Sequence, residues 1–236
     1  MEQRYARIET LFGVEAMQRI NKAKVLLVGV GGVGGWCAEA LVRSGIENLT
    51  LMDFDTVQES NLNRQLVATE QTIGKDKTVA MREHLLEINS KANIIALQRR
   101  YSTEADIDFN KFDYVVDCID SVADKLLLII NTLHSTATLF SAMGAGKKTD
   151  PTKVKTEQFE KVSYCPLART LRKQLKQRMI TLPHSFTCVY SDEQPQENAD
   201  GQAVIGSFAP VVGVFGLTLA SLVLNDIRQK CNNLQN

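Results

Sequence analysis

Residues 24–36 read KVLLVGVGGVGGW, and this stretch decides the fold. An apolar run at residues 25–28 enters a turn in which Gly29, Gly31 and Gly34 fit the spacing G-x-G-x-x-G. Glycines let a backbone approach a phosphate closely, and the amide groups and dipole of a following helix attract its negative charge. The stretch therefore predicts a strand, a phosphate-binding turn and a helix. By itself it does not distinguish NAD from ATP.

Strand-like apolar runs alternate with segments of helical spacing along most of the chain. The patterns predict strands at residues 24–28, 48–53, 93–97, 112–117, 138–142 and 186–190, and helices at 4–22, 33–44, 77–88, 121–134, 166–176 and 211–227. This alternation implies right-handed crossovers and a mainly parallel sheet. We expect a Rossmann-like, doubly wound α/β fold, with helices on both faces and a C-terminal extension that completes the sheet.

Length and composition favour one domain over residues 1–236, since 44% of the residues are hydrophobic. We expect a core at residues 22–146, followed at 147–236 by a basic helix, a loop and an interface helix. The 5 cysteines include no C-x-x-C pair, which argues against a structural zinc site. The amino terminus lacks signal-peptide character, so a reducing cytoplasm is expected.

Two segments have a composition that allows more than one interpretation. Residues 147–178 contain ten Lys or Arg and three Asp or Glu, a net charge of +7 in a chain of zero net charge. A solvated helical face explains this excess, and so does a footprint for a polyanion such as RNA. Residues 208–224 are nearly apolar but contain Pro210, Gly213 and Gly216, and are slightly shorter than a spanning helix of ~20 residues. A core or subunit-interface helix is favoured over a membrane span.

The residues after the second strand favour ATP. Asp53 follows Gly31 by 22 residues, at the distance expected of a carboxylate that binds ribose hydroxyls. The polar loop at 53–65 then supplies Asn61, Arg64 and Gln65, and Lys75 and Lys77 follow at the next helix. A triphosphate carries charge that Arg and Lys can neutralise. The alternatives are a surface ion pair for Arg64 and a helix-start lysine for Lys77. No Tyr-x-x-x-Lys pairing is present, which argues against one type of NAD dehydrogenase.

The segment DCIDS at residues 117–121 ends the fourth predicted strand. A carboxylate here could hold magnesium, which usually binds one or two carboxylates together with phosphate oxygens. Helix capping is the alternative role for Asp117 and Asp120.

Four ordered motifs, GVGGVG, LMDFDTVQESNLNRQ, GKDK and DCIDS, resemble the ubiquitin-activating-enzyme-like superfamily, of the HesA/MoeB/ThiF type. The resemblance implies ATP and magnesium as cofactors, and adenylation of a carboxylate with release of pyrophosphate. Asp53 would bind ribose and Asp120 the metal. Arg7 would reach the ATP of the partner subunit in a homodimer. The implied catalytic residues are Asp120, Arg64, Lys77 and Arg7. The implied ATP-binding residues are Gly29, Gly31, Gly32, Gly34, Asp53, Asp55, Asn61, Arg64, Gln65, Lys77, Asp120 and Ser121.

Departures from the superfamily pattern narrow the choice of branch. The zinc cysteines of the sulfur-carrier activators are absent, and Gln202 stands eight residues before Pro210, where many members have a cysteine. Cys188 is the nearest thiol in sequence, but its apolar surroundings predict a buried, structural side chain. Residues 144–176 resemble the tRNA threonylcarbamoyladenosine dehydratase branch, which adenylates the carboxylate of that nucleoside and cyclises it with loss of AMP.

This branch implies a tRNA partner, whose best candidate contacts are Arg169, Arg172, Lys173 and Lys176. DNA is not an expected partner. Two alternatives remain open. One is an activator of a ubiquitin-like sulfur carrier, or an enzyme that uses a sulfur-relay protein. The other is a nucleotide-binding scaffold without chemistry.

Overall fold

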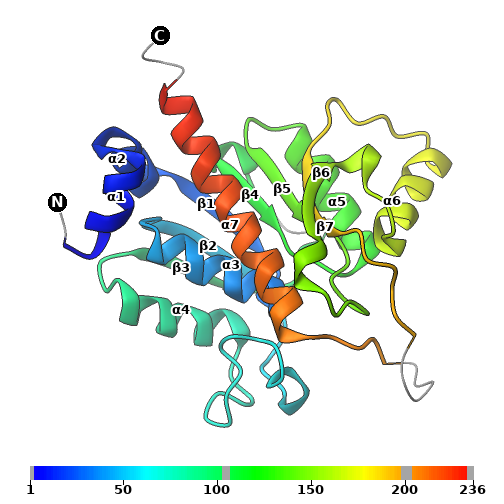
Figure 1. Cartoon of the computed structure of the whole chain (residues 1–236), viewed down its shortest axis with the longest axis horizontal. Helices are drawn as coiled ribbons and strands as arrows, with labels where there is room; N and C mark the ends of the chain where they lie inside the picture. The colour runs from blue at the N-terminus through cyan, green and yellow to red at the C-terminus, as the bar shows by residue number, and fades with distance from the viewer. Residues whose placement is uncertain (1–2, 103–106, 198–203, 233–236) are drawn as a thin grey trace.

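A seven-stranded sheet organises the chain, in the order β3-β2-β1-β4-β5-β7-β6 (Figure 1). The computed structural model describes residues 3–102, 107–197 and 204–232. Neighbouring strands are parallel except for β6, which runs antiparallel to β7. The strands are β1 (Lys24–Val28), β2 (Asn48–Asp53), β3 (Asn93–Gln98), β4 (Tyr114–Asp117), β5 (Thr138–Ala142), β6 (Val154–Gln158) and β7 (Thr187–Ser191). The predicted doubly wound, mainly parallel α/β fold is confirmed.

Helices cover both faces of this sheet, and each face has its own apolar core. Residues of α2, α3, α4 and α7 form the core on one face, and residues of α5 and α6 form the core on the other. The α-helices are α1 (Ala6–Phe12), α2 (Val14–Lys22), α3 (Gly32–Arg43), α4 (Lys77–Ile88), α5 (Val122–Leu133), α6 (Pro166–Gln177) and α7 (Ala209–Asn232). Short 3₁₀ turns are η1 (Gln3–Tyr5), η2 (Glu59–Asn61), η3 (Phe109–Lys111), η4 (Pro151–Lys153) and η5 (Phe159–Lys161).

The N-terminal helix and strand β6 differ from the sequence-based predictions. The single helix predicted at residues 4–22 is divided into α1 and α2 by Gly13, whose φ of 86° is rarely adopted by residues with a side chain. Strand β6 was not predicted, because its residues VKTEQ lack an apolar run. It lies at the edge of the sheet, where charged side chains are common because they discourage pairing with other chains.

Helix α7 is the long apolar segment near the carboxyl end, and it is longer than the predicted helix at residues 211–227. By length and composition α7 could cross a membrane, but 56% of its most apolar 18-residue window is buried inside the protein. It packs directly on α3, since a Cβ atom at Gly216 would lie 2.4 Å from Val33 O. These contacts agree with a core helix.

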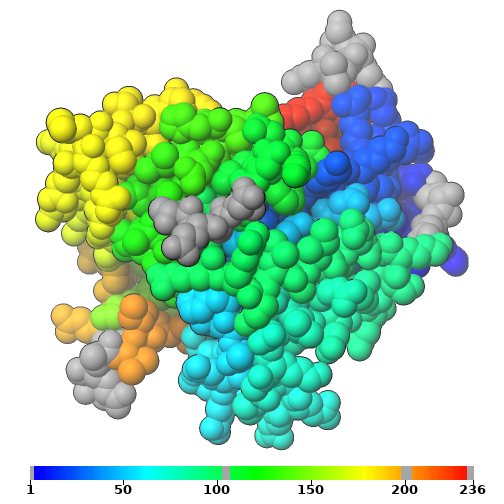
Figure 2. All heavy atoms as spheres, turned by 180° about the vertical axis from the view of Figure 1, so that it is seen from behind, coloured from blue at the N-terminus to red at the C-terminus, as the bar shows by residue number. Residues whose placement is uncertain are grey.

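The parallel strands end at one edge of the sheet, which is where ligands bind in such folds. The turns after β1, β2, β4 and β5 therefore lie near one another. The N-terminal helices and α6 lie at opposite ends of the molecule (Figures 1 and 2).

Candidate active site

A cleft of about 800 Å³ opens at the carboxyl edge of the sheet. It collects most of the residues that the sequence predicts for ATP binding, although they come from separate parts of the chain. Among the lining residues are Gly29, Gly31, Gly32, Asp53, Asp55, Asn61, Arg64, Gln65, Lys77 and Asp120. Gly34 and Ser121 lie outside this lining, and so does Arg7.

The glycine turn is shaped by close backbone approaches. Gly29 has a φ of 93°, and a Cβ atom there would lie 2.6 Å from Cys118 O. A Cβ atom at Gly34 would lie 1.8 Å from Gly29 O, so Gly34 permits α3 to pack on the turn. Gly31 and Gly32 line the cleft, and the atoms nearest to a Cβ built at either glycine belong to side chains, not to the backbone. The turn therefore presents the start of α3 to the cleft, as a phosphate site requires.

The carboxylate of Asp53 is fixed above the glycine turn. Its Oδ2 accepts a hydrogen bond from Val30 N at 2.6 Å, and its Oδ1 accepts one from Asp55 N at 2.9 Å. A carboxylate oxygen can accept more than one hydrogen bond. Asp53 can therefore still accept hydrogen bonds from the hydroxyls of a ribose.

Helical turn η2 and the residues directly after it carry three polar side chains that line the cleft. Asn61 Oδ1 accepts from Gln58 N at 3.1 Å, which leaves the Asn61 amide NH₂ for a ligand. Arg64 Nη1 donates to Ser60 O at 2.8 Å, which fixes one end of its guanidinium. Gln65 is 6% exposed, and its Oε1 has no hydrogen-bond partner among the described residues. A buried amide oxygen without a partner fits a ligand that donates a hydrogen bond.

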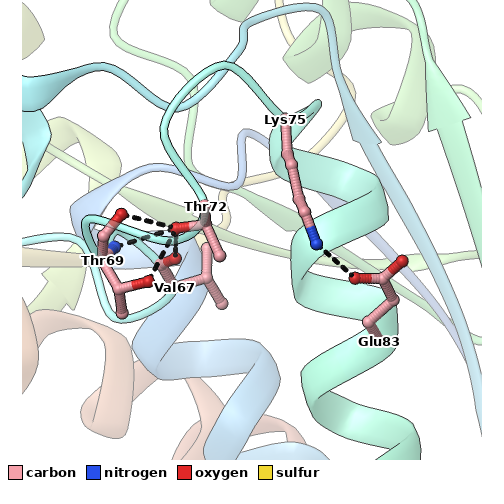
Figure 3. A network of polar contacts seen from close by, with 5 residues as sticks. All are labelled: Val67, Thr69, Thr72, Lys75 and Glu83. Carbon is pink, nitrogen blue, oxygen red and sulfur yellow. Dashed lines mark hydrogen bonds and ion pairs between the residues drawn. The ribbon is translucent and has the colours of Figure 1, made fainter.

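The loop between η2 and α4 is tied together by polar contacts (Figure 3). Thr72 Oγ1 donates to Val67 O at 2.6 Å and accepts from Thr69 N at 2.9 Å. Lys75 Nζ lies 3.3 Å from Glu83 Oε2, so this lysine, which precedes α4, is paired with a residue of that helix. The contacts close the loop ahead of α4, which begins at Lys77.

Lys77 is the lysine that lines the cleft. Its side chain is 7% exposed, and its Nζ lies 2.8 Å from Asp55 Oδ2. Lys77 N also donates to Asp55 O at 3.0 Å. Both contacts fix a buried ammonium in the cleft that the glycine turn and Arg64 also line, where it can neutralise phosphate charge.

Asp117 is neither exposed nor a helix cap. It is fully buried, and its Oδ2 lies 2.8 Å from Lys125 Nζ and 2.6 Å from Ser141 Oγ. Lys125 Nζ also donates to Ile119 O at 2.9 Å, and Ile119 N donates to Asp117 Oδ1 at 3.0 Å. This cluster fixes the turn that leads to Asp120. Lys125 was not predicted from the sequence, although a lysine directly before the apolar run at residues 126–130 is a visible signal.

Asp120 is exposed and lines the cleft. Its side chain has no hydrogen-bond or ion-pair partner in the part of the chain that the structure describes. Ser121 is the residue before α5, and its side chain makes no capping hydrogen bond. Asp120 therefore presents a free carboxylate to the cleft.

The cysteines do not form a thiol-based site. Cys188 is fully buried in β7, and its burial raises its thiol pKa. Cys118 lines the cleft and is only half-buried, and desolvation together with the charge of Asp117 raises its thiol pKa. A raised pKa disfavours the reactive thiolate. Gln202, which stands where many superfamily members have a cysteine, lies outside the described residues.

The basic candidates on α6 divide into two groups. Arg169, Lys173 and Lys176 are exposed. Arg172 instead donates to Phe159 O at 2.9 Å, and its guanidinium carbon lies 5.8 Å from the centre of the Phe159 ring. Arg172 therefore attaches α6 to the rest of the protein. The other three residues belong to the lobe at one end of the molecule, yellow in Figure 2.

Arg7 lines a second, separate hollow of about 430 Å³ between α1, α3 and α7. Apolar side chains surround it, and Leu11 and Leu217 are 71% and 48% exposed. An arginine beside exposed apolar residues suits contact with another protein surface.

The donor set of the cleft suits magnesium better than a transition metal. No group of three or more His, Cys, Asp or Glu residues that could hold a metal occurs within residues 3–102, 107–197 and 204–232. Magnesium needs only one or two protein carboxylates when phosphates and water complete its coordination. The free carboxylate of Asp120 fits this requirement.

Comparisons with known proteins agree with this geometry. The sequence matches the ThiF family over residues 4–236. It is 35% identical over 197 residues to the tRNA threonylcarbamoyladenosine dehydratase of Bacillus subtilis, an alignment that covers 83% of this chain and 77% of that protein. The enzyme of the same name from Escherichia coli is 34% identical over 198 residues, 81% of this chain and 74% of that one.

Solved structures of the E. coli enzyme are similar to this chain over almost its whole length. The crystal structure of the E. coli dehydratase in complex with AMP has a TM-score of 0.88 and 31% identity, and the match covers 97% of this chain and 95% of that one. The complex of that enzyme with ATP has a TM-score of 0.87 and 30% identity, over 98% and 96% of the two chains. The chain belongs to the ThiF family.

Proposed function

We propose that this protein is an ATP-dependent tRNA threonylcarbamoyladenosine dehydratase. It adenylates the carboxylate of that nucleoside in tRNA and then cyclises it. The observation that carries the proposal is the likeness over almost the whole chain to an enzyme of this name, solved with both ATP and AMP. The cleft supports the proposal, because it is lined by the glycine turn, by Asp53, whose carboxylate can bind ribose hydroxyls, and by the cationic residues Arg64 and Lys77.

The proposed reaction has two steps. In the first, a substrate carboxylate oxygen bonds to the α-phosphorus of ATP while the bond to the β-phosphate oxygen breaks, and pyrophosphate leaves. In the second, the carbamoyl group attacks the acyl carbon and loses an N–H proton. AMP leaves with the former carboxylate oxygen. No cysteine is needed, which agrees with the buried Cys188 and the raised pKa of Cys118.

Named residues of the cleft take separate parts in this proposal. Asp53 binds the ribose, and Asn61 and Gln65 donate to or accept from the nucleotide. Arg64 and Lys77 stabilise negative charge that develops on the phosphates. Asp120 would hold Mg²⁺, which neutralises phosphate charge when bound.

Partners and compartment follow from the same proposal. The exposed residues Arg169, Lys173 and Lys176 contact the tRNA backbone. The hollow around Arg7 forms part of a homodimer interface, which brings Arg7 toward the partner subunit. A cytoplasmic location is supported by the cysteines, all of which are free thiols. Replacing Leu217 with Glu should shift the dimer toward monomer in light scattering, and an unchanged dimer mass would contradict this interface.

The direct test uses purified protein, ATP, Mg²⁺ and tRNA that carries threonylcarbamoyladenosine. Mass spectrometry of the digested tRNA should show loss of one water from that nucleoside, with AMP and pyrophosphate formed in equal amounts. An unchanged nucleoside in tRNA, together with ATP turnover on a ubiquitin-like sulfur carrier, would replace the proposal with the carrier-activating alternative.

A further inference from the structure

The cleft has a second half that no ATP motif explains. This half is formed by the segment after β5 and by the start of α6, and it contains residues 142–148, Pro166, Leu167, Pro195 and Ile205. The acidic residues of the lining, Asp53, Asp55, Asp120 and Asp124, all belong to the first half. Lys147 and Lys148 are the charged residues of the second half, and most of its other lining residues are apolar.

The two lysines have different surroundings. Lys148 is 2% exposed, and its Nζ donates to Tyr164 O at 3.3 Å and also to Glu193 O. Its ammonium is therefore used inside the protein. Lys147 lines the cleft and is only half-buried. Its ammonium has no hydrogen-bond or ion-pair partner among the described residues.

The backbone of Lys147 is held in an unfavourable conformation. Its φ is 59°, in the left-handed region where a residue with a Cβ atom costs about 1–2 kcal/mol. Two long-range hydrogen bonds hold it there, from Lys147 N to Gly206 O and from Gln196 N to Lys147 O, both at 2.8 Å. A glycine would adopt this conformation without strain, so a lysine makes the folded protein less stable than a glycine would at this position. Strained residues of this kind often lie at functional sites, which suggests a binding role for Lys147.

The carboxylate of Glu193 fixes the segment that follows Lys147. Glu193 is 5% exposed, and its carboxylate accepts hydrogen bonds from Thr149 N, Thr149 Oγ1 and Asp150 N at 3.0–3.2 Å. These bonds attach the segment after Lys147 to the chain beyond β7. The ammonium of Lys147 is therefore carried by a segment that is fixed on both sides.

We propose that Lys147 is the anchor for the carboxylate of the substrate nucleoside, and that the second half of the cleft is the subsite for that nucleoside. The inference rests on the proposed function. The unpaired ammonium of Lys147 lies among apolar lining residues. This arrangement is complementary to the threonylcarbamoyl side chain, which ends in a carboxylate. The position also suits the reaction, since the same cleft holds the glycine turn and Asp120, where the proposed ATP would present the α-phosphorus that this carboxylate attacks.

The test compares two tRNAs that differ only in the presence of threonylcarbamoyl on the nucleoside. With a non-hydrolysable ATP analogue present, Lys147→Gly should weaken binding of the modified tRNA by about tenfold or more, because a charge-assisted contact is lost. Binding of the unmodified tRNA should change less than about twofold, since its phosphates are the same. Lys147→Arg should keep most of the affinity for the modified tRNA.

Met179→Gly is the matched control, because Met179 has a φ of 53°, is 91% exposed and lies outside the cleft. It relieves the same backbone strain, so both glycine variants should keep or raise the thermal midpoint, and Met179→Gly should not affect tRNA binding. Equal affinity of Lys147→Gly and the unaltered protein for modified tRNA would overturn the inference. Equal weakening for both tRNAs would assign Lys147 to a backbone phosphate and overturn it as well. If the unaltered protein does not bind or convert modified tRNA, the proposed function fails too.

Discussion

The two halves of the cleft are positioned in different ways. In the first half, called the nucleotide half here because it holds the proposed ATP-binding residues, polar side chains follow strand ends and are fixed by contacts with nearby turns, as Asp53 is by Val30 N and Asp55 N. In the other half, the segment around Lys147 is fixed by Glu193 and Gln196, which lie more than forty residues further along the chain. The residues of the nucleotide half can therefore be identified from short sequence motifs. The position of Lys147 in the second half cannot, because it depends on contacts between distant parts of the chain.

Asp117 and Lys125 form a buried ion pair that fixes the turn leading to Asp120, and breaking this pair should have the largest effect. Lys125→Met leaves a buried carboxylate without its counter-charge, so the free energy of unfolding should fall by about 3–5 kcal/mol. Urea denaturation at neutral pH measures this change. The double variant Asp117→Asn with Lys125→Met should recover part of the loss. A loss in Lys125→Met no larger than that of an ordinary surface substitution would show that the pair does not support the site.

A sharper test of the nucleotide half removes the free carboxylate. Asp120→Asn should lower pyrophosphate release by about 10²–10³-fold, because a charge that acts on the phosphates is lost. Since Asp120 is exposed and unpaired among the described residues, stability should change by no more than about 0.5 kcal/mol. Glu70→Gln, at an exposed carboxylate outside the cleft, is the control and should keep normal turnover. Near-normal turnover in Asp120→Asn would remove Asp120 from the proposed chemistry.

The role of Glu193 in fixing the second half of the cleft can be tested through the pH dependence of stability. Burial alone would raise the pKa of the Glu193 carboxyl, but the hydrogen bonds from Asp150 N, Thr149 N and Thr149 Oγ1 outweigh burial and lower this pKa to about 2 from its usual 4.5. A pKa that is lower in the folded state adds stability above the unfolded value, and this stability is lost as the pH falls from about 4.5 toward 2.

Glu193→Gln should therefore lower the free energy of unfolding at pH 7 by about 1–3 kcal/mol. The difference from the unaltered protein should shrink as the pH falls below the usual carboxyl pKa, because protonation then removes the advantage of the carboxylate. Urea titrations at neutral and acidic pH measure both values. A difference that is independent of pH would contradict this role of Glu193.

The smallest effects are expected at three exposed basic residues of α6 that do not line the cleft. Replacing Arg169, Lys173 or Lys176 with Gln should weaken tRNA binding modestly, and should lower the slope of log Kd against log salt by about one for each contact. ATP affinity should not change. Arg172→Gln should instead reduce stability, because Arg172 contacts Phe159. Unchanged salt dependence in all three exposed variants would favour a solvated helical face.

The sequence was sufficient for most of the fold, and most of the residues that it predicts for ATP binding line one cleft. Alternating strand and helix patterns predicted the parallel sheet, and the glycine turn, Asp53 and Asp120 were identified from motifs. Strand β6 was missed because an edge strand does not need an apolar run. The roles of Asp117 and Lys147 could not be predicted, because each depends on a partner or a backbone angle that only the folded chain fixes.

Exchange of labelled pyrophosphate into ATP tests the central claim most directly, because it reports adenylation of a carboxylate before any later step. We expect this exchange to require tRNA that carries threonylcarbamoyladenosine, and to be absent both with the unmodified tRNA and with a ubiquitin-like sulfur carrier. Exchange that depends on the carrier, and not on the modified tRNA, would contradict the claim.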